Sequence, residues 1–360
     1  MTMLWIGTYP AEGLGAPVGH GEGLWRVSLE RGTLSSPVQV TTQAAPSYVA
    51  KHPTLPLLYA VEEASPTVLS VIAFGDVARE VACEVARVTV GGEAGCHILV
   101  APNASALYVS NYGTGELTVV PLGDDGLPSG VPAQAWPHGG SGPRLDRQEG
   151  SHAHFACMSP DGTHVLVADL GTDEIRRYRV GGGGLLSDQG IATTLPPGSG
   201  PRHIAVRGEL LYVVCELDHT LRTLRWDRPS ATAEVIAELP TTLAAQRTGD
   251  TTYDAHIAVV PRAQGDVLLV SVRGVDVISL FDVAPEGELT YRAALDVGYW
   301  PRHFAVVDDA LVVAAEKGHE VRAYALDDVL ALPPESECGA LATLPYSSVG
   351  VTSPASVAAL

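Results

Sequence analysis

The sequence predicts an all-β chain that folds as one seven-bladed β-propeller over residues 1–360. Three observations predict this fold. The apolar segments are short and β-branched, related segments recur about every 50 residues, and the two chain ends resemble complementary parts of one repeat. Thirty-eight glycines and 26 prolines, without a tripeptide period, supply the turns that many short strands require.

The strands are predicted from apolar runs such as LLYVVC and VLLVSV, which are bounded by turn residues. Runs of this length with many β-branched side chains fit buried strands better than helices. The turns between them have suitable chemistry, as in Pro160-Asp161-Gly162. Each repeat is therefore predicted to contain a short strand, a turn, an apolar strand, a polar turn and a strand in which apolar and polar residues alternate.

Six such segments can be aligned on one position. The position is occupied by Tyr48, His97, His154, His203, His256 and His303, at intervals of 49, 57, 49, 53 and 47 residues. A period near 50, with three visible strands and room for a fourth, matches a propeller blade of four antiparallel strands.

The two ends of the chain are predicted to form the seventh blade. The N-terminal segment starts at the WIGTY position of a repeat and so lacks an inner strand. The C-terminal SPASVAAL resembles PSYVA and PRHIAV, and it places Ser356 in the aligned position, 53 residues after His303. Pairing of this last strand with the first blade would close the ring and remove exposed edges.

Charge and composition exclude several classes of function. The net charge of −19 repels nucleic acid, so no nucleic-acid partner is expected, and an anionic substrate would need a local cluster of arginines. No run of 18 apolar residues exists, and the start has no basic leader, so no membrane association is expected. Five scattered cysteines are interpreted as buried thiols of a cytoplasmic protein. The oligomeric state is left open.

Charged residues recur 13 to 17 residues after the aligned position, at the ends of the apolar strands. This second column comprises Gly7-Thr8-Tyr9, Glu62-Glu63, Asn111-Tyr112, Asp169-Leu170-Gly171, Glu216, Arg273 and Glu316. Buried charge is costly unless it is paired. Two interpretations stay open: ion pairs that lock blades together, or a polar site at the mouth of the channel.

Arginines gather around the same mouth of the channel. They are Arg144, Arg147, Arg202, Arg273 and Arg302. Arg202 and Arg302 directly precede two of the aligned histidines, which suggests equivalent places in two blades. An electropositive pocket for phosphate or carboxylate is one interpretation. Pairing of these arginines with the acidic surface is the alternative.

Several stretches carry a resemblance to a known family: WIGTY, SNYGTGELTVVPL, RQEGSHAHFACMSPDG, VADLGTDEIRRYRV, GPRHIAV, VVCEL and VSVRGVDVISLFDV. They resemble the bacterial lactonase propellers, a family that includes the propeller-type 6-phosphogluconolactonases and, more distantly, fungal carboxy-cis,cis-muconate cyclases. The resemblance covers essentially the whole chain. It implies hydrolysis of a small anionic lactone, 6-phosphogluconolactone of the pentose phosphate pathway, with no cofactor and no metal.

The resemblance also implies a set of site residues. The catalytic set falls on His154, Arg202, Glu216 and Arg273. His152 is an alternative to His154, because residues i and i+2 share one face of a strand. The candidate substrate-binding residues are Arg147, His152, His203, His256 and Arg302. The chain departs from the family pattern at Cys215 and Val272, where asparagine is usual.

Lactone opening needs a base for water, donors for the oxyanion and an acid for the leaving alkoxide. Either Glu216 or His154 is the predicted base, and a pKa raised by burial would suit Glu216. Arg202 and Arg273 would bind the oxyanion or the anionic tail of the substrate. The chain contains no G-x-S-x-G elbow, and its H-A-H motif has no third metal ligand at a suitable spacing.

Two alternative functions remain from the sequence. One is a lactonase or cycloisomerase for another carboxylate-bearing lactone, and the other is a non-catalytic propeller that acts as an interaction platform. Residues 228–253 are interpreted as an insertion-like loop and a candidate cover for the channel mouth.

Overall fold

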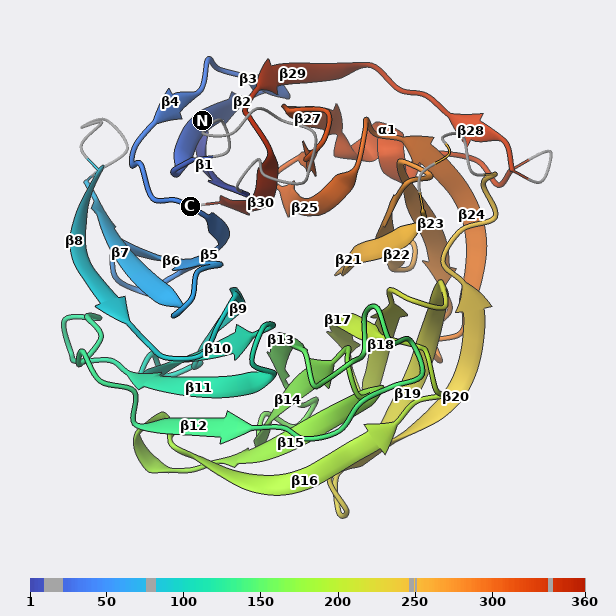
Figure 1. Cartoon of the computed structure of the whole chain (residues 1–360). Coiled ribbons are helices and arrows are strands. Elements are labelled where there is room, and N and C mark those ends of the chain that lie inside the picture. Colours follow the sequence, from blue (N-terminus) through green and yellow to red (C-terminus); the bar gives the residue numbers. More distant parts are fainter. Residues whose placement is uncertain (10–21, 76–81, 246–248, 250, 336–338, 360) are drawn as a thin grey trace.

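The computed structural model describes residues 1–9, 22–75, 82–245, 249, 251–335 and 339–359. These residues contain 30 strands in seven sheets, arranged as a ring around a central axis (Figure 1). The helical elements of the described residues are the five-residue α1 (Leu326–Leu330) and a 3-10 turn (Gly182–Gly184). The predicted seven-bladed β-propeller is confirmed.

Six blades consist of four antiparallel strands in chain order, with the first strand nearest the axis and each later strand farther out. They are β5 (Pro46–Lys51), β6 (Leu57–Glu62), β7 (Val68–Phe74) and β8 (Ala82–Thr89); β9 (Gly95–Val100), β10 (Ala106–Asn111), β11 (Glu116–Pro121) and β12 (Gln134–Pro137); β13 (Ala153–Met158), β14 (His164–Asp169), β15 (Glu174–Val180) and β16 (Leu186–Thr194); β17 (Pro201–Arg207), β18 (Leu210–Cys215), β19 (Thr220–Asp227) and β20 (Thr232–Pro240); β21 (Tyr253–Val260), β22 (Val267–Arg273), β23 (Val277–Val283) and β24 (Leu289–Asp296); and β25 (Pro301–Val307), β26 (Ala310–Ala315), β27 (Glu320–Ala325) and β29 (Tyr346–Gly350). The short β28 (Leu341–Ala342) pairs in parallel with β24.

The seventh blade joins the two ends of the chain. Its inner strand β30 (Pro354–Ala359) pairs antiparallel with β1 (Thr2–Thr8), and β2 (Trp25–Glu30), β3 (Thr33–Leu34) and β4 (Val38–Gln39) complete the sheet. In this pairing Ser356 lies opposite Gly7. A Cβ on Gly7 would approach the Ser356 hydroxyl and the Pro46 carbonyl to 2.5 Å, so this contact requires glycine. The predicted closure of the ring is confirmed.

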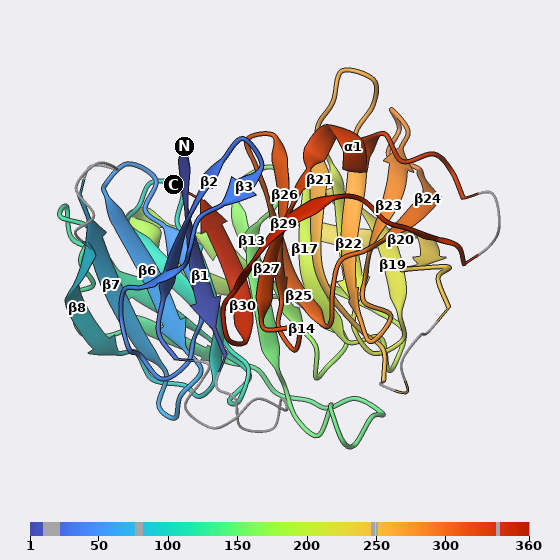
Figure 2. The same ribbon diagram turned by 90° about the horizontal axis from the view of Figure 1, so that it is seen from above.

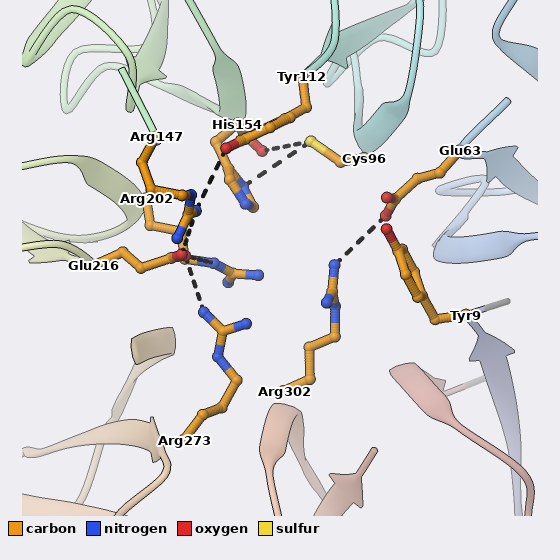
Figure 3. A pocket seen from close by; sticks show the side chains of 10 residues that line it. All are labelled: Tyr9, Glu63, Cys96, Tyr112, Arg147, His154, Arg202, Glu216, Arg273 and Arg302. Carbon is orange, nitrogen blue, oxygen red and sulfur yellow. Dashed lines mark hydrogen bonds and ion pairs between the residues drawn. The ribbon is translucent and has the colours of Figure 1, made fainter. Parts of the chain in front are cut away.

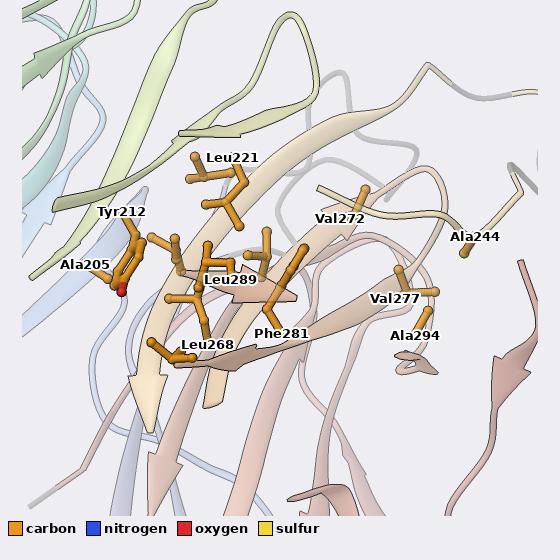
Figure 4. Close-up of a cluster of buried hydrophobic side chains, with 14 of the residues drawn as sticks. Ala205, Tyr212, Leu221, Ala244, Leu268, Val272, Val277, Phe281, Leu289 and Ala294 are labelled. Atoms are coloured by element: carbon orange, nitrogen blue, oxygen red, sulfur yellow. The ribbon is translucent and has the colours of Figure 1, made fainter. Parts of the chain in front are cut away.

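The second strand of each complete blade is buried along its whole length, because a neighbouring blade covers each of its faces. This explains why the apolar runs of the sequence are continuous rather than alternating. One such cluster joins the blade of β17–β20 to the blade of β21–β24 and contains Tyr212, Leu268 and Phe281 (Figure 4). The Tyr212 hydroxyl donates a hydrogen bond of 2.9 Å to the Gly287 carbonyl of the adjacent blade, which satisfies its polar end.

Every inner strand contains a β-bulge near its start. Pro201 lies opposite Cys215 and His203 opposite Val214, so Arg202 is an extra residue on β17. The same irregularity occurs on the other six inner strands. A bulge re-aims a side chain that regular pairing would direct elsewhere. The extra residues of six inner strands line two cavities of the channel: Ser47, Cys96, His154, Arg202, Arg302 and Ala355.

The bulge on β13 corrects the alignment of one repeat. Phe155 lies opposite Ala168, as His203 lies opposite Val214, so Phe155 and not His154 is equivalent to His203. His154 is the extra residue, equivalent to Arg202. The alignment was wrong by one position here, because the two histidines of H-A-H imitate the alternation of a regular strand.

The region predicted to be a loop over residues 228–253 contains a strand of nine residues. Thr232–Pro240 forms β20, the outer edge of its blade, so this part does not cover the channel. Residues 246–248 and 250 lie outside the described residues. Figure 2 shows α1 on one face of the ring and the loop that leads into β13 on the opposite face.

No helix within the described ranges has the length and apolar character needed to cross a membrane. The four cysteines that the structure describes are free thiols, and Cys338 lies outside the described residues.

Candidate active site

A cavity of about 200 Å³ opens at the end of the channel where the inner strands begin (Figure 3). Its described lining comes from three sources. The second strands supply five residues, which lie at their ends or directly after them: Tyr9, Glu63, Tyr112, Glu216 and Arg273. The bulges of the inner strands supply Cys96, His154, Arg202 and Arg302. The loop before β13 supplies Arg147. All four residues of the predicted catalytic set therefore meet in one cavity.

Glu216 is the centre of one wall of this cavity. Its carboxylate pairs with three guanidinium groups: Arg147 Nη2 at 2.7 Å, Arg202 Nε at 2.8 Å and Arg273 Nη2 at 2.9 Å. Only 4% of the Glu216 side chain is exposed. One carboxylate thus holds three cations that come from three different segments of the chain.

The backbone fixes these arginines on their other sides. Arg202 Nη1 donates to the Ala255 carbonyl at 2.6 Å, and Arg273 Nη2 donates to the Asp254 carbonyl at 3.0 Å. Gly200, at φ +61, begins the turn into β17, and a Cβ there would strike Leu217 at 2.5 Å. Glycine is therefore needed to bring Arg202 into place.

Arg147 reaches the cavity because a buried glutamine anchors its loop. Gln148 donates to the Leu170 carbonyl at 2.9 Å and to the Asp173 carboxylate at 2.8 Å. The Arg147 guanidinium then lies 5.1 Å above the Tyr253 ring and contacts the Tyr112 hydroxyl at 3.4 Å. Arg147 is the most exposed of the three arginines on this wall, at 24% of its side chain.

The expected rise in the pKa of Glu216 is not found. Burial by itself would raise it, but the charges of Arg273, Arg147 and Arg202 outweigh burial and hold the pKa of Glu216 well below its ordinary value. Burial, followed by the charge of Arg273, lowers the pKa of Arg202 to about 9. An anion bound at this wall would relieve the repulsion between the arginines.

His154 and His152 are separated by the bulge. His154 lines the cavity, and burial followed by the charge of Arg202 lowers its pKa well below the ordinary value, so the imidazole is neutral. His152 precedes β13 and lies behind Tyr112: the rings stack at 4.3 Å, and its Nδ1 lies 2.7 Å from the Tyr112 carbonyl. Because the bulge breaks the alternation of the strand, the two histidines do not present one shared face to the cavity.

The opposite wall contains a single arginine between two carboxylates. Arg302 lies 3.2 Å from Glu316 and 3.6 Å from Glu63, and its guanidinium lies 4.6 Å above the Tyr9 ring. Glu63 faces the cavity, whereas Glu316 is fully buried behind Arg302. Acidic groups therefore outnumber basic groups on this wall, whereas basic groups are in excess around Glu216.

A belt of rings surrounds the channel one residue beyond the bulges, and three of its members, Tyr48, His203 and His303, line a small second cavity. Neighbouring centroids are 4.0 to 5.8 Å apart around the circle Tyr48, His97, Phe155, His203, His256 and His303. Burial lowers the pKa of His97 and of His303 to about 3. The histidines of the belt are therefore neutral and can pack closely without mutual repulsion.

His203 and His256 lie behind Arg202. Arg202 Nη1 is 3.1 Å from His203 Nε2, and His203 Nδ1 is 2.9 Å from His256 Nδ1. Because a guanidinium only donates, His203 Nε2 accepts and its Nδ1–H is left to donate to His256. His203 lines a small second cavity of about 10 Å³ below the first, whereas His256 is not among the described residues that line either cavity.

Four lining residues are absent from the predicted site: Tyr9, Glu63, Cys96 and Tyr112. The sequence contains a signal for each of them. Tyr9, Glu63 and Tyr112 belong to the second column, and Cys96 precedes His97 as Arg202 precedes His203. These two positions, applied to every blade, contain all four of these residues.

The lining contains four arginines and two glutamates, so the cavity is positive within a chain of net charge −19. Among the described residues, no three His, Cys, Asp or Glu side chains are grouped as metal ligands.

Comparison with known proteins gives concordant matches. The sequence model of the family described as "Lactonase, 7-bladed beta-propeller" matches residues 3–333. A 6-phosphogluconolactonase of Bacillus subtilis is 29% identical over 317 residues, which is 83% of each chain. Two solved structures share the fold: a protein from Lactobacillus plantarum (TM-score 0.83, 24% identity, all of both chains) and a periplasmic gluconolactonase of Pseudomonas aeruginosa (TM-score 0.80, 23% identity, 100% of this chain and 99% of the other).

Proposed function

As the chain belongs to the lactonase family of seven-bladed β-propellers, and is thus a hydrolase of lactone esters, we propose that its substrate is 6-phosphogluconolactone. The observation that carries this proposal is the cavity with four arginines in a strongly acidic protein. Guanidinium groups bind phosphate in a bidentate manner. The name of the Bacillus subtilis relative supports the same substrate. The predicted cytoplasmic location stays a prediction.

The wall around Glu216 is suited to the anionic end of the substrate. Its three arginines and one carboxylate have a formal charge of +2, which complements a phosphate dianion. Arg147 and Arg273 would bind the phosphate. Arg202 lines both cavities and is the deepest of the three, so it would hold the carbonyl oxygen that becomes the oxyanion. In this arrangement Glu216 and His203 are positioning residues for the arginines.

Neither predicted base is well suited to accept a proton from water. Glu216 already neutralises three arginines, and its lowered pKa makes it a weak base. The lowered pKa of His154 weakens that imidazole in the same way. We assign His154 a contact with the substrate, as a neutral ring on the wall of the cavity.

The test is hydrolysis of freshly generated 6-phosphogluconolactone, followed by acid release and corrected for spontaneous opening. Glucono-1,5-lactone, which lacks the phosphate, should have a kcat/KM about 10- to 100-fold lower, the effect of one or two hydrogen bonds to a charged group. A carboxylate-bearing muconolactone is the third substrate.

Arg225→Ala is the matched control, because it removes one exposed arginine from the blade that holds Arg202 and should leave the rate unchanged. Preference for the muconolactone would overturn the substrate assignment. No acceleration with any lactone would favour the interaction platform.

A further inference from the structure

The two walls of the cavity differ in the balance of charge. The Glu216 wall has three arginines for one carboxylate, all within 2.9 Å. The opposite wall has one arginine for two carboxylates, and Arg302 lies closer to Glu316 than to Glu63, at 3.2 and 3.6 Å. Glu316 therefore takes up much of the positive charge of Arg302, and Glu63 is the less strongly held carboxylate of the cavity.

Glu63 and Glu216 occupy equivalent places in two blades. Each directly follows a buried second strand, and each donates its backbone N–H to the residue before an inner strand: Glu63 to Ala45 at 3.0 Å and Glu216 to Gly200 at 2.8 Å. Figure 3 shows the two side chains entering the cavity from opposite sides. With the phosphate at Arg147 and Arg273 and the carbonyl oxygen at Arg202, the ester would lie between Arg202 and Glu63, which both line the two cavities.

We propose that Glu63 is a further catalytic residue, which takes a proton from the attacking water and returns it to the ring oxygen of the lactone. This inference rests on the proposed lactone hydrolysis. Glu63 lines both cavities and so faces the substrate site and the space below it. About 10% of its side chain is exposed, which leaves it accessible to a ligand in the cavity but shielded from bulk water.

Glu63 alone carries the proton between the attacking water and the ring oxygen of the lactone. Glu63 removes a proton from water, and the water oxygen bonds to the carbonyl carbon while the carbonyl electron pair moves to the oxygen held by Arg202. When the carbonyl re-forms, the bond from carbon to the ring oxygen breaks, and Glu63 gives its proton to that oxygen. The new carboxylic acid then ionises to solvent, and Glu63 is again a carboxylate.

The surroundings of Glu63 favour reversible proton transfer. Burial raises its pKa, an effect that Arg302 and the hydroxyls of Ser47 and Tyr9 offset only in part and that Glu316 increases. The charged and titratable groups that face Glu63 are Tyr9, Cys96, Arg302 and Glu316. The charge of Glu63 and burial in turn raise the pKa of Tyr9, so the Tyr9 hydroxyl stays protonated and can donate to the carboxylate.

Two glutamine variants test the proposal through the pH profile of kcat. A base must be ionised, so the rate of the wild type rises with pH through the pKa of Glu63. We call this rise of kcat with pH the acidic limb of the profile. Glu63→Gln should lower kcat by about 10²-fold or more and remove the acidic limb, with KM changed by only a few fold. Glu316→Gln should keep the limb but move it to lower pH, because it removes a charge that raises the pKa of Glu63.

Binding of 6-phosphogluconate by calorimetry shows that the site of each variant is intact. A Glu63→Gln variant with wild-type kcat and an unchanged acidic limb would overturn the role of Glu63. The role of Glu63 would also be overturned if the rise of kcat with pH occurred at the same pH in Glu316→Gln as in the wild type. This second variant keeps the proposal testable if Glu63→Gln does not fold. An inactive wild type would instead refute the proposed function, so the two failures are distinguishable.

Discussion

Asp169 and Glu216 are buried carboxylates at the ends of the second strands of neighbouring blades, but their partners differ. Asp169 accepts hydrogen bonds from the His152 backbone at 2.8 Å, from Ser151 Oγ at 2.5 Å and from His138 Nδ1 at 2.9 Å. Glu216 instead contacts three arginines and faces the cavity. Asp169 thus holds loops together, whereas Glu216 organises a binding wall.

The difference arises from a shift of one residue. Asp169 is the last residue of β14 and Cys215 the last of β18, so Glu216 is equivalent to Leu170 and not to Asp169. Successive residues of a strand point to opposite sides. The second column of the sequence therefore mixes two positions, one directed into the blade and one directed into the channel. An ion pair between blades occurs at the channel position itself, where Glu216 pairs with Arg273 of the next blade. A functional site at this mouth stays a prediction.

The largest effect expected from this comparison is on activity at the cavity. Arg202→Ala should lower kcat by about 10²- to 10³-fold, the loss found when one oxyanion donor is removed. Steady-state kinetics with 6-phosphogluconolactone measure the loss, and a melting curve shows whether the variant is folded. A folded Arg202→Ala variant with a kcat near that of the wild type would mean that Arg202 does not stabilise the oxyanion.

A smaller effect, on stability rather than on activity, is expected at Asp169. Asp169→Asn should lower the free energy of unfolding by about 2–3 kcal/mol, since it weakens buried hydrogen bonds to a charged group. Urea unfolding measures this change, and kcat of the folded variant should remain within a few fold of wild type. A large loss of kcat with unchanged stability would contradict the structural role.

The pH dependence sharpens this second prediction. Burial by itself would raise the pKa of Asp169, but the hydrogen bonds from His138 and Ser151 outweigh it and lower the pKa. A lowered pKa stabilises the fold above the unfolded pKa of about 4, and this contribution is lost as the pH falls through the folded pKa. The difference in the free energy of unfolding between the wild type and Asp169→Asn should therefore become smaller below about pH 4. If this difference stays constant as the pH falls, Asp169 is not ionised in the folded protein.

The smallest expected effect is at the rim of the cavity. Tyr112→Phe removes the hydroxyl that contacts Arg147 at 3.4 Å and keeps the ring that stacks on His152. KM for the phosphorylated lactone should rise about threefold, as expected for the loss of one weak hydrogen bond, and kcat should not change. A large fall in kcat would mean that the Tyr112 hydroxyl takes part in the chemistry.

The fold was predictable because each blade repeats the same pattern of buried strands and turns. The intervals between Tyr48, His97 and the later repeats predicted the ring, and the place of Ser356 in the aligned position predicted its closure. Charged residues at the ends of apolar strands drew attention to Glu216 and Arg273, and Arg202 stood out because it precedes an aligned histidine as Arg302 does. These parts of the structure follow from local pattern.

The remaining features depend on geometry that the pattern does not record. A bulge adds one residue without changing the apolar alternation, so His154 was aligned with the wrong neighbour. The pKa of Glu216 follows from three arginines that come together only in the folded ring. Glu63 was visible in the second column, but its weak pairing to Arg302 could be recognised only from distances across blades.

The most direct test of the account is a crystal structure of the protein with 6-phosphogluconate, the expected product. The phosphate should lie within hydrogen-bond distance of Arg147 and Arg273, and the new carboxylate should lie between Arg202 and Glu63. A product molecule bound with its phosphate away from the three-arginine wall, or bound outside this cavity, would contradict the account.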